Sequence, residues 1–136
     1  GAKTATYAVK PDIGIALDVT LANDIPGTEA GSKMGVGVTL AIQDSSHLGH
    51  RGFLNYLSDL SKELNLDVQY DLMLAGGTDS GEMHKAFDGV INVTLSIPSR
   101  YIHSHREDVV DTITLITEFA KRLNWEVLET IRQSNR

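Results

Sequence analysis

The chain has 136 residues, with 12 Lys and Arg against 18 Asp and Glu, which gives a formal net charge of -6. Its 41% hydrophobic and 22% charged residues are typical of one globular domain and argue against a disordered chain or a bilayer span. Because there is no cysteine, disulfides, thiolate metal ligands and a thiol nucleophile are excluded. The net charge is negative and the basic residues are scattered, so the sequence shows no basic patch for a polyanion. We therefore expect neither a nucleic-acid partner nor a membrane partner.

Helices and strands are expected to alternate along the chain. Residues 1–9 are typical of a helix, which Pro11 ends because proline interrupts helical hydrogen bonding. Residues 13–19 (IGIALDV) form a nearly continuous apolar run, which indicates a strand buried on both faces of a sheet. Residues 20–35 collect Gly, Pro and small polar residues and predict a long loop. The next expected elements are a strand at 36–42, a helix at 49–66, a strand at 67–74, a short helix at 82–87 and a strand at 90–97.

The last expected helix starts at a capping box. Ser104 and Glu107 have the S-x-x-E spacing of that motif, and apolar residues at helical spacing continue from Val109 to Phe119. The resulting element order predicts an α/β layered fold with a mixed, mostly buried sheet flanked by helices.

Three polar segments follow predicted strands. Asp18 closes the first apolar run, residues 76–80 follow the third strand, and residues 99–103 follow the fourth. Ligands of open α/β sheets bind beyond the carboxyl ends of the strands, so these segments are expected to converge at one edge. From the residues alone, two interpretations of Asp18 stay open: it is a functional carboxylate of a binding or catalytic site, or it caps a turn. Residues 76–81 (GGTDSG) cradle an anion or form a tight turn before a helix.

The histidines leave further alternatives open. His103 is a ligand, a general base or a residue that bonds the loop backbone. His47 and His50 lie near Asp44 and superficially resemble a metal cluster. However, they fall where an amphipathic helix is expected to start, and Arg51 beside them disfavours a divalent cation. His84 is interpreted as a surface residue.

Three motifs in order carry a resemblance to a known family. They are residues 16–20 (ALDVT) with the loop 24–27, residues 76–81 (GGTDSG) and residues 97–104 (IPSRYIHS). Together they closely resemble the glutamyl aminopeptidase, TET aminopeptidase and cellulase M family. The resemblance spans essentially residues 1–136 and implies the C-terminal portion of a zinc-aminopeptidase-like catalytic domain. Members of that family use two divalent ions, usually zinc or cobalt, and often assemble into large hollow oligomers.

The resemblance also implies roles for single residues. Asp18 and His103 match metal ligands of the family, one on each ion. The general-base glutamate, the other ligands and an inserted smaller domain match no part of this chain. We therefore expect weak or absent metal binding and no activity from the chain alone. The substrate-cleft candidates are Gly76, Gly77, Thr78, Asp79, Ser99, Arg100 and Tyr101.

The implied function is that of a metal-dependent aminopeptidase, which releases N-terminal residues from peptides, in incomplete form. The chain is interpreted as a fragment of a complete enzyme, as a short gene product or one half of a split enzyme, or as a non-catalytic structural or oligomerisation module. Glycan hydrolysis is less favoured, because nothing in the sequence indicates a carboxylate pair flanking a sugar. We expect a homo-oligomer, or association with the missing N-terminal portion. The first residues lack a signal-peptide pattern, so a cytoplasmic location is expected.

Overall fold

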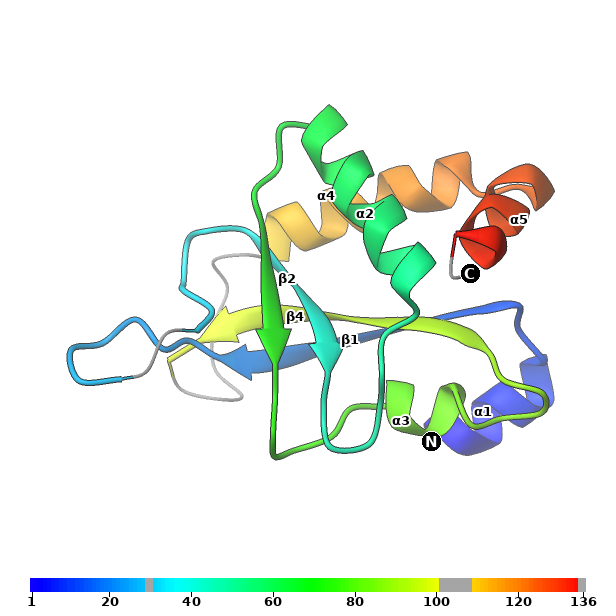
Figure 1. Ribbon diagram of the computed structural model, residues 1–136, viewed down its shortest axis with the longest axis horizontal. Helices are drawn as coiled ribbons and strands as arrows, with labels where there is room; N and C mark the ends of the chain where they lie inside the picture. Colours follow the sequence, from blue (N-terminus) through cyan, green and yellow to red (C-terminus); the bar gives the residue numbers. More distant parts are fainter. Residues whose placement is uncertain (29–30, 101–108, 135–136) are drawn as a thin grey trace.

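The computed structural model of the chain describes residues 1–28, 31–100 and 109–134 (Figure 1). Within them, helices and strands alternate in the expected order, and one further helix follows at the C-terminal end. The helices are α1 (Ala2–Val9), α2 (Arg51–Glu63), α3 (Ser80–Met83), α4 (Val109–Arg122) and α5 (Trp125–Gln133). The strands are β1 (Ile13–Leu21), β2 (Val38–Gln43), β3 (Val68–Leu72) and β4 (Ile91–Ser99). None of these helices is long and apolar enough to cross a membrane.

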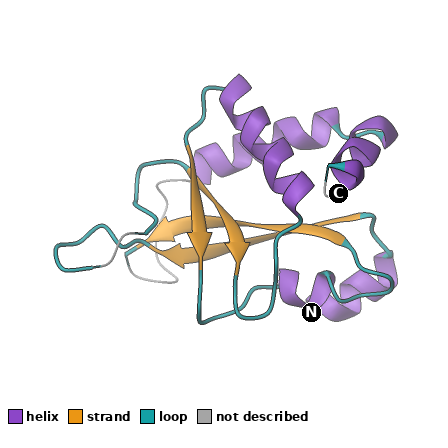
Figure 2. Ribbon diagram, viewed as in Figure 1, coloured by secondary structure: helices purple, strands orange, loops and turns teal. Residues whose placement is uncertain are grey.

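The four strands form one mixed sheet in the order β1-β4-β2-β3. β1 runs parallel to β4, β2 runs parallel to β3, and β2 runs antiparallel to β4. β2 and β3 are joined through α2, which is the crossover that a parallel pair requires. Helices α2, α4 and α5 lie on one side of the sheet, and α1 and α3 lie on the other (Figures 1 and 2). The expected layered α/β fold is therefore confirmed.

The two faces of the central strands differ in polarity because side chains alternate along a strand. On the face towards α2, α4 and α5, apolar side chains form the core of the molecule. The opposite face of β4 carries Asn92, Thr94 and Ser96, and all three are buried. Thr39 of β2, which is in register with Ser96, continues this polar face. The core residues of the apolar side include Val38, Leu40, Phe53, Leu57, Val93, Leu95, Leu115, Phe119 and Ile131.

The edge strands are less covered than the sequence predicts. The apolar run at 13–19 indicates burial on both faces, but Leu17 is 60% exposed and Leu21 at the end of β1 is 51% exposed. At the other edge, Tyr70 and Leu72 of β3 are also exposed. β1 has a neighbour on one side only among the described residues, so the prediction of full burial is wrong for its outer part.

The helices also differ from the expected ones: α2 is shorter than 49–66, and α3 lies at Ser80–Met83 instead of 82–87. α2 starts at Arg51, where the His50 side chain accepts a hydrogen bond from Phe53 N at 3.3 Å, and His47 precedes the helix. α5 was not expected from the sequence, and its N-cap is Asn124. Residues 104–107, the expected capping box of α4, lie outside the described residues.

Candidate active site

Asp18 lies on the polar face of the sheet, near the carboxyl end of β1. It is in register with Ser96 of β4 and is half-buried. Its Oδ1 atom accepts a hydrogen bond of 2.8 Å from Val19 N, and no basic side chain of the described residues forms an ion pair with it. A half-buried carboxylate without a cationic partner is costly to desolvate, and carboxylate oxygen is a suitable donor for a zinc or cobalt ion. Asp18 therefore fits a role as one metal ligand.

The glycine-rich turn at 76–79 packs onto the same face of the sheet. Thr78 Oγ1 lies 2.9 Å from Thr94 Oγ1, and Thr94 Oγ1 lies 2.8 Å from Ser80 Oγ. Thr94 is in register with Ala16 of β1, two positions before Asp18. The turn leads into α3, which has only four residues, and Asp79 at its N-cap makes no side-chain capping bond. Hydroxyl contacts to β4 therefore fix the position of the turn.

Asp44 holds this turn from the other side. Its buried carboxylate accepts hydrogen bonds from Ser46 N at 2.7 Å, Ser46 Oγ at 2.9 Å, Thr78 N at 3.2 Å and Thr78 Oγ1 at 2.9 Å. Burial acts to raise the pKa of the Asp44 carboxyl group, but the hydrogen bonds from Ser46 and Thr78 outweigh burial and hold that pKa below its ordinary value. Asp44 is therefore a buried anion at neutral pH.

A cavity of about 310 Å³ separates the end of β1 from the turn after β3. Thr20 and Leu21 line one wall, and Asp71, Met73 and Gly76 belong to the other. The Thr20 hydroxyl donates a hydrogen bond to the Asp71 carboxylate between these walls. The cavity thus begins at Val19, the residue after Asp18, and reaches the first glycine of the turn.

The turn after β3 reaches this face of the sheet by a different route from the one expected. Since β2 and β3 run opposite to β4, the turn after β3 does not follow the carboxyl ends of β1 and β4. It meets β4 at Thr94, in the middle of that strand, and Gly76 meets the end of β1 across the cavity. Asp18, in register with Ser96, and the turn, in contact with Thr94, therefore lie on the same face of the sheet, and the single carboxyl edge expected from the sequence is wrong for the turn.

The end of β4 is tied to the loop after β1. Ser99 is buried and in register with Leu21, and its carbonyl oxygen accepts a hydrogen bond from Ala22 N at 2.9 Å. Arg100 donates to both carboxylate oxygens of Asp24, at 2.8 and 3.2 Å, and this pairing holds the pKa of Asp24 below its ordinary value. Ser99 and Arg100 thus connect two segments, whereas Tyr101 and His103 lie outside the described residues.

Two histidines lie beside this site in positions the sequence did not predict. The His47 ring is fully buried, and neither of its nitrogens has a hydrogen-bond partner. Its Nδ1 atom is 3.9 Å from Asp44 Oδ2, and its ring centroid is 5.8 Å from that of half-buried His84. The Asn92 amide nitrogen beside it is bonded to Ser80 O instead. His84, which the sequence suggested as a surface residue, is half-exposed, and its ring also packs against the buried ring of His47.

Metal-binding side chains do not gather here. Across residues 1–28, 31–100 and 109–134, no three of the His, Asp and Glu side chains lie close enough to hold a metal ion. Asp44 and His47 are neighbours, but His50 caps α2 instead of joining them. The resemblance implies two metal ligands, Asp18 and His103. Asp18 is within the described residues, and His103 is not.

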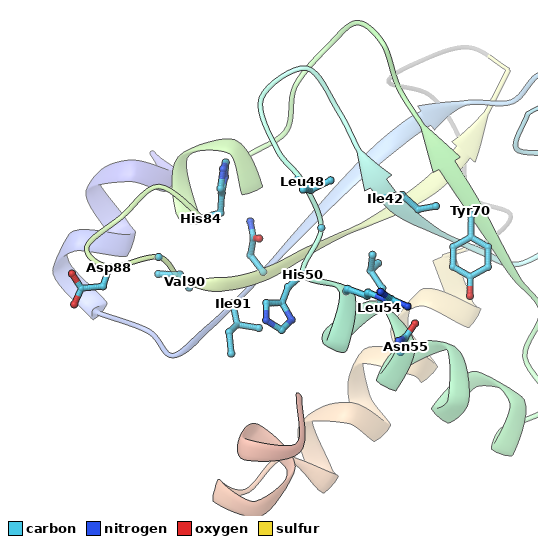
Figure 3. A pocket seen from close by; sticks show the side chains of 14 residues that line it. Ile42, Leu48, His50, Leu54, Asn55, Tyr70, His84, Asp88, Val90 and Ile91 are labelled. Atoms are coloured by element: carbon cyan, nitrogen blue, oxygen red, sulfur yellow. The ribbon is translucent and has the colours of Figure 1, made fainter. Parts of the chain in front are cut away.

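A larger cavity lies elsewhere. It has a volume of about 840 Å³ and opens between the start of α2 and the start of β4 (Figure 3). His50, Leu54, Tyr70, His84 and Ile91 are among its lining residues. None of the predicted site residues lines it, so this cavity and the one beside Asp18 are separate.

Comparison with known proteins identifies the family. The chain has the fold of a TET aminopeptidase structure from Thaumarchaeota archaeon SCGC AB-539-E09, with a TM-score of 0.91 and 33% identity over 96% of this chain and 39% of that one. The PhTET1-12s structure, a dodecamer in the asymmetric unit, has a TM-score of 0.74 and 25% identity over 90% of this chain and 38% of that one. The glutamyl aminopeptidase of Lactococcus lactis subsp. cremoris is 34% identical over 97% of this chain and 38% of that protein.

Residues 1–115 match the family model of the M42 glutamyl aminopeptidases. The chain therefore belongs to this family of peptidases, as its three motifs imply. It spans about two fifths of the length of the relatives described above.

Proposed function

We propose that this chain is part of the catalytic domain of a metal-dependent aminopeptidase that releases N-terminal residues from peptides. The observation that carries the proposal is the family match over residues 1–115, a range that includes Asp18 and the turn at 76–79. The relatives named above are aminopeptidases, and their length leaves room for the ligands and the general base that match no part of this chain.

Two divalent ions, zinc or cobalt, complete the proposed site. The chemistry that such a pair supplies when bound is activation of water at neutral pH and polarisation of the scissile carbonyl group. Asp18 would contribute a carboxylate oxygen to one ion, and His103, in its neutral form, a ring nitrogen to the other. The cavity beside Asp18 would receive the first residue of the peptide, and the turn at 76–79 would form part of its wall.

The chain alone is proposed to be inactive and to bind metal weakly, since a catalytic zinc ion normally has three protein ligands. Leu17 and Leu21 leave an apolar strip on the outer part of β1, which supports association with further polypeptide. That polypeptide is either the portion that the relatives have in addition or further copies of the protein, as in the dodecameric relative.

The test uses the longest natural polypeptide that contains this sequence. We expect it to release N-terminal residues from short peptides, and a chelator to abolish this activity. Asp18→Ala and His103→Ala should each lower kcat/KM by more than about 100-fold, because losing even the outer partners of metal ligands costs roughly 10 to 100-fold. Metal content, measured on the same samples, should fall in both variants.

Asp59→Ala is the matched control, since the Asp59 side chain is exposed on α2 and pairs with Lys62. It should keep the activity and the metal content of the parent. Full activity after Asp18→Ala, or activity that resists chelation, would contradict the proposed function.

A further inference from the structure

Several hydrogen bonds connect the loop that precedes α2 to the turn that precedes α3. The first, residues 44–47, follows β2, and the second, residues 76–79, follows β3 and leads into the first residues of α3. Ser45 N donates to Gly76 O at 3.1 Å, and Ser45 Oγ donates to the same oxygen. Asp44 accepts hydrogen bonds from both the amide and the hydroxyl group of Thr78. Both ends of the turn at 76–78 are thus bonded to the 44–47 loop.

The two segments pack closely where Gly77 and Gly81 face Ser46. A Cβ atom added to Gly77 would lie 2.9 Å from Ser46 Oγ, and one added to Gly81 would lie 2.1 Å from it. At Gly77 only the Ser46 hydroxyl group would have to rotate, but at Gly81 the Ser46 Cβ atom would also lie 2.8 Å from the added atom, so position 81 requires glycine. A shift of the 44–47 loop would therefore shift the turn with it.

The carboxylate of Asp44 is the centre of this junction. It is 3% exposed and receives four hydrogen bonds, and all four donors come from Ser46 and Thr78. An amide in its place would present an NH₂ group to some of these donors, leaving a buried donor without an acceptor. The size of the side chain would be unchanged, so the charge and acceptor capacity of Asp44 are what the junction requires.

The turn held by this junction is also a wall of the cavity next to Asp18. Gly76 lines the cavity, and Thr78 contacts Thr94 on the strand that is paired with β1. We propose that Asp44 is a positioning residue of the substrate cleft, because its carboxylate sets the position of the 76–79 turn and thereby the width of the cavity beside Asp18. This inference rests on the proposed function, since the cavity is a cleft only if the protein binds peptides there.

The first test requires no activity. Backbone hydrogen exchange is measured on the full 136-residue chain and on Asp44→Asn. In the parent, the Thr78 amide should exchange slowly, because it is bonded to a buried carboxylate. In Asp44→Asn, exchange at Thr78 should become at least about 10-fold faster, as expected for the loss of more than about 1.4 kcal/mol of local stability. Amides of the central strands should keep the parent rates. An unchanged Thr78 rate in a folded Asp44→Asn chain would overturn the proposal.

The second test uses the complete enzyme and peptide substrates. Asp44→Asn and Thr78→Val should raise KM about 10-fold with kcat within about 3-fold, since a displaced cleft wall weakens substrate and transition state equally. Thr78→Ser keeps the hydroxyl group and should restore the parent KM. Asp59→Asn, the same chemical change on the exposed side of α2, should alter neither constant. A fall in kcat with KM unchanged would overturn the positioning role.

The two tests separate this inference from the proposed function. If the unmodified enzyme releases no N-terminal residues, the proposed function fails, and the role of Asp44 in substrate binding fails with it. Faster Thr78 exchange in Asp44→Asn would still establish the junction in that case. If the enzyme is active and Asp44→Asn leaves KM unchanged, the proposed function stands and this inference is wrong.

Discussion

At the scale of single residues, His47 is the most costly polar group of the described chain. Its ring is fully buried and both nitrogens lack hydrogen-bond partners. Burial lowers the pKa of His47 below its ordinary value of 6.5, the nearby Asp44 carboxylate acts to raise it, and His84 acts to lower it. The folded protein therefore keeps His47 neutral at a pH where the unfolded chain already binds a proton.

This difference predicts a loss of stability in mild acid. Above about pH 6.5 the ring is neutral in both states, and the folded state is not penalised. As the pH falls below 6.5, the unfolded state binds the proton first, so the free energy of unfolding decreases until the folded pKa is reached. His47→Phe removes this proton and the two unbonded nitrogens. We expect the variant to be at least as stable as the parent at pH 7.5 and to lose less stability at pH 5.5, measured by urea unfolding.

His50→Asn is the companion variant. Burial also lowers the pKa of His50, and Asn preserves the N-cap of α2, so this change should remove a second part of the same pH dependence. An identical loss between pH 7.5 and 5.5 in the parent and in His47→Phe would show that the buried ring does not titrate in this way.

The sequence predicted some residues of the site better than others. Asp18 and the turn at 76–79 could be proposed from the sequence because they belong to local motifs, and their roles stay predictions. Asp44 was not assigned a role, since its value to the site comes from hydrogen bonds to Thr78, which is distant in sequence. The burial of His47 was missed for the same reason, because the pattern around it resembles a helix start. Arg100 was expected in the cleft, and its bond to Asp24 could not be read from spacing.

At the scale of elements, the contact between α2 and α5 depends on one glycine. A Cβ atom on Gly52 would lie 2.2 Å from Ile131 O, and 2.3 Å from Ser134 Oγ. Ile131 is fully buried on the same side of α5, so the helix cannot move away without exposing it. The close approach explains a glycine inside α2, where alanine would otherwise be the better helix former.

Gly52→Ala is therefore expected to destabilise the chain by about 1–3 kcal/mol through overpacking, despite its gain in helix propensity. The measurement is the urea midpoint of unfolding. Asn55→Ala is the control, because Asn55 is exposed on the same helix, and it should be neutral or slightly stabilising. A Gly52→Ala chain as stable as the Asn55→Ala chain would mean that α5 is not held against α2 in solution.

Most of the elements could be predicted from the sequence, and their ends could not. The apolar runs placed all four strands, but β1 and β4 each continue two residues beyond the predicted end, at Leu21 and Ser99. Leu21 and Ser99 pair with each other, so pairing between the two strands, and not the strand propensity of the local sequence, explains the extension. α5 was missed because its apolar face, with Leu128 and Ile131, is too short to indicate a helix by itself. The helix is stabilised by packing against α2, which the local sequence does not show.

At the scale of the whole molecule, the outer part of β1 is the largest departure from a self-contained core. Leu17 and Leu21 are more than half exposed, on a strand that has a free edge in the described structure. Apolar side chains on a free strand edge favour association with other chains. We expect the isolated chain to form dimers or larger species and to bind an apolar dye.

Leu17→Thr combined with Leu21→Thr should reduce both properties, since threonine maintains strand propensity and removes most of the apolar surface. Light scattering measures the association, and dye fluorescence measures the exposed surface. Leu48→Thr, at a residue that is 64% exposed in the loop before α2, is the control and should behave as the parent. A parent chain that is monomeric and does not bind the dye would contradict the assignment of β1 as an association surface.

The pairing of β1 with β4 also determines the order in which the molecule can fold. Ile13 pairs with Ile91 and Leu21 with Ser99, so this ladder joins segments separated by most of the chain. Closing so long a loop loses entropy before any contact is gained, whereas β2, α2 and β3 are consecutive and close only short loops. On the ribosome, β1 is synthesised well before β4, its partner strand. A strand with two exposed leucines thus waits for its neighbour while the chain between them is made, and the nascent chain is prone to aggregate during this interval.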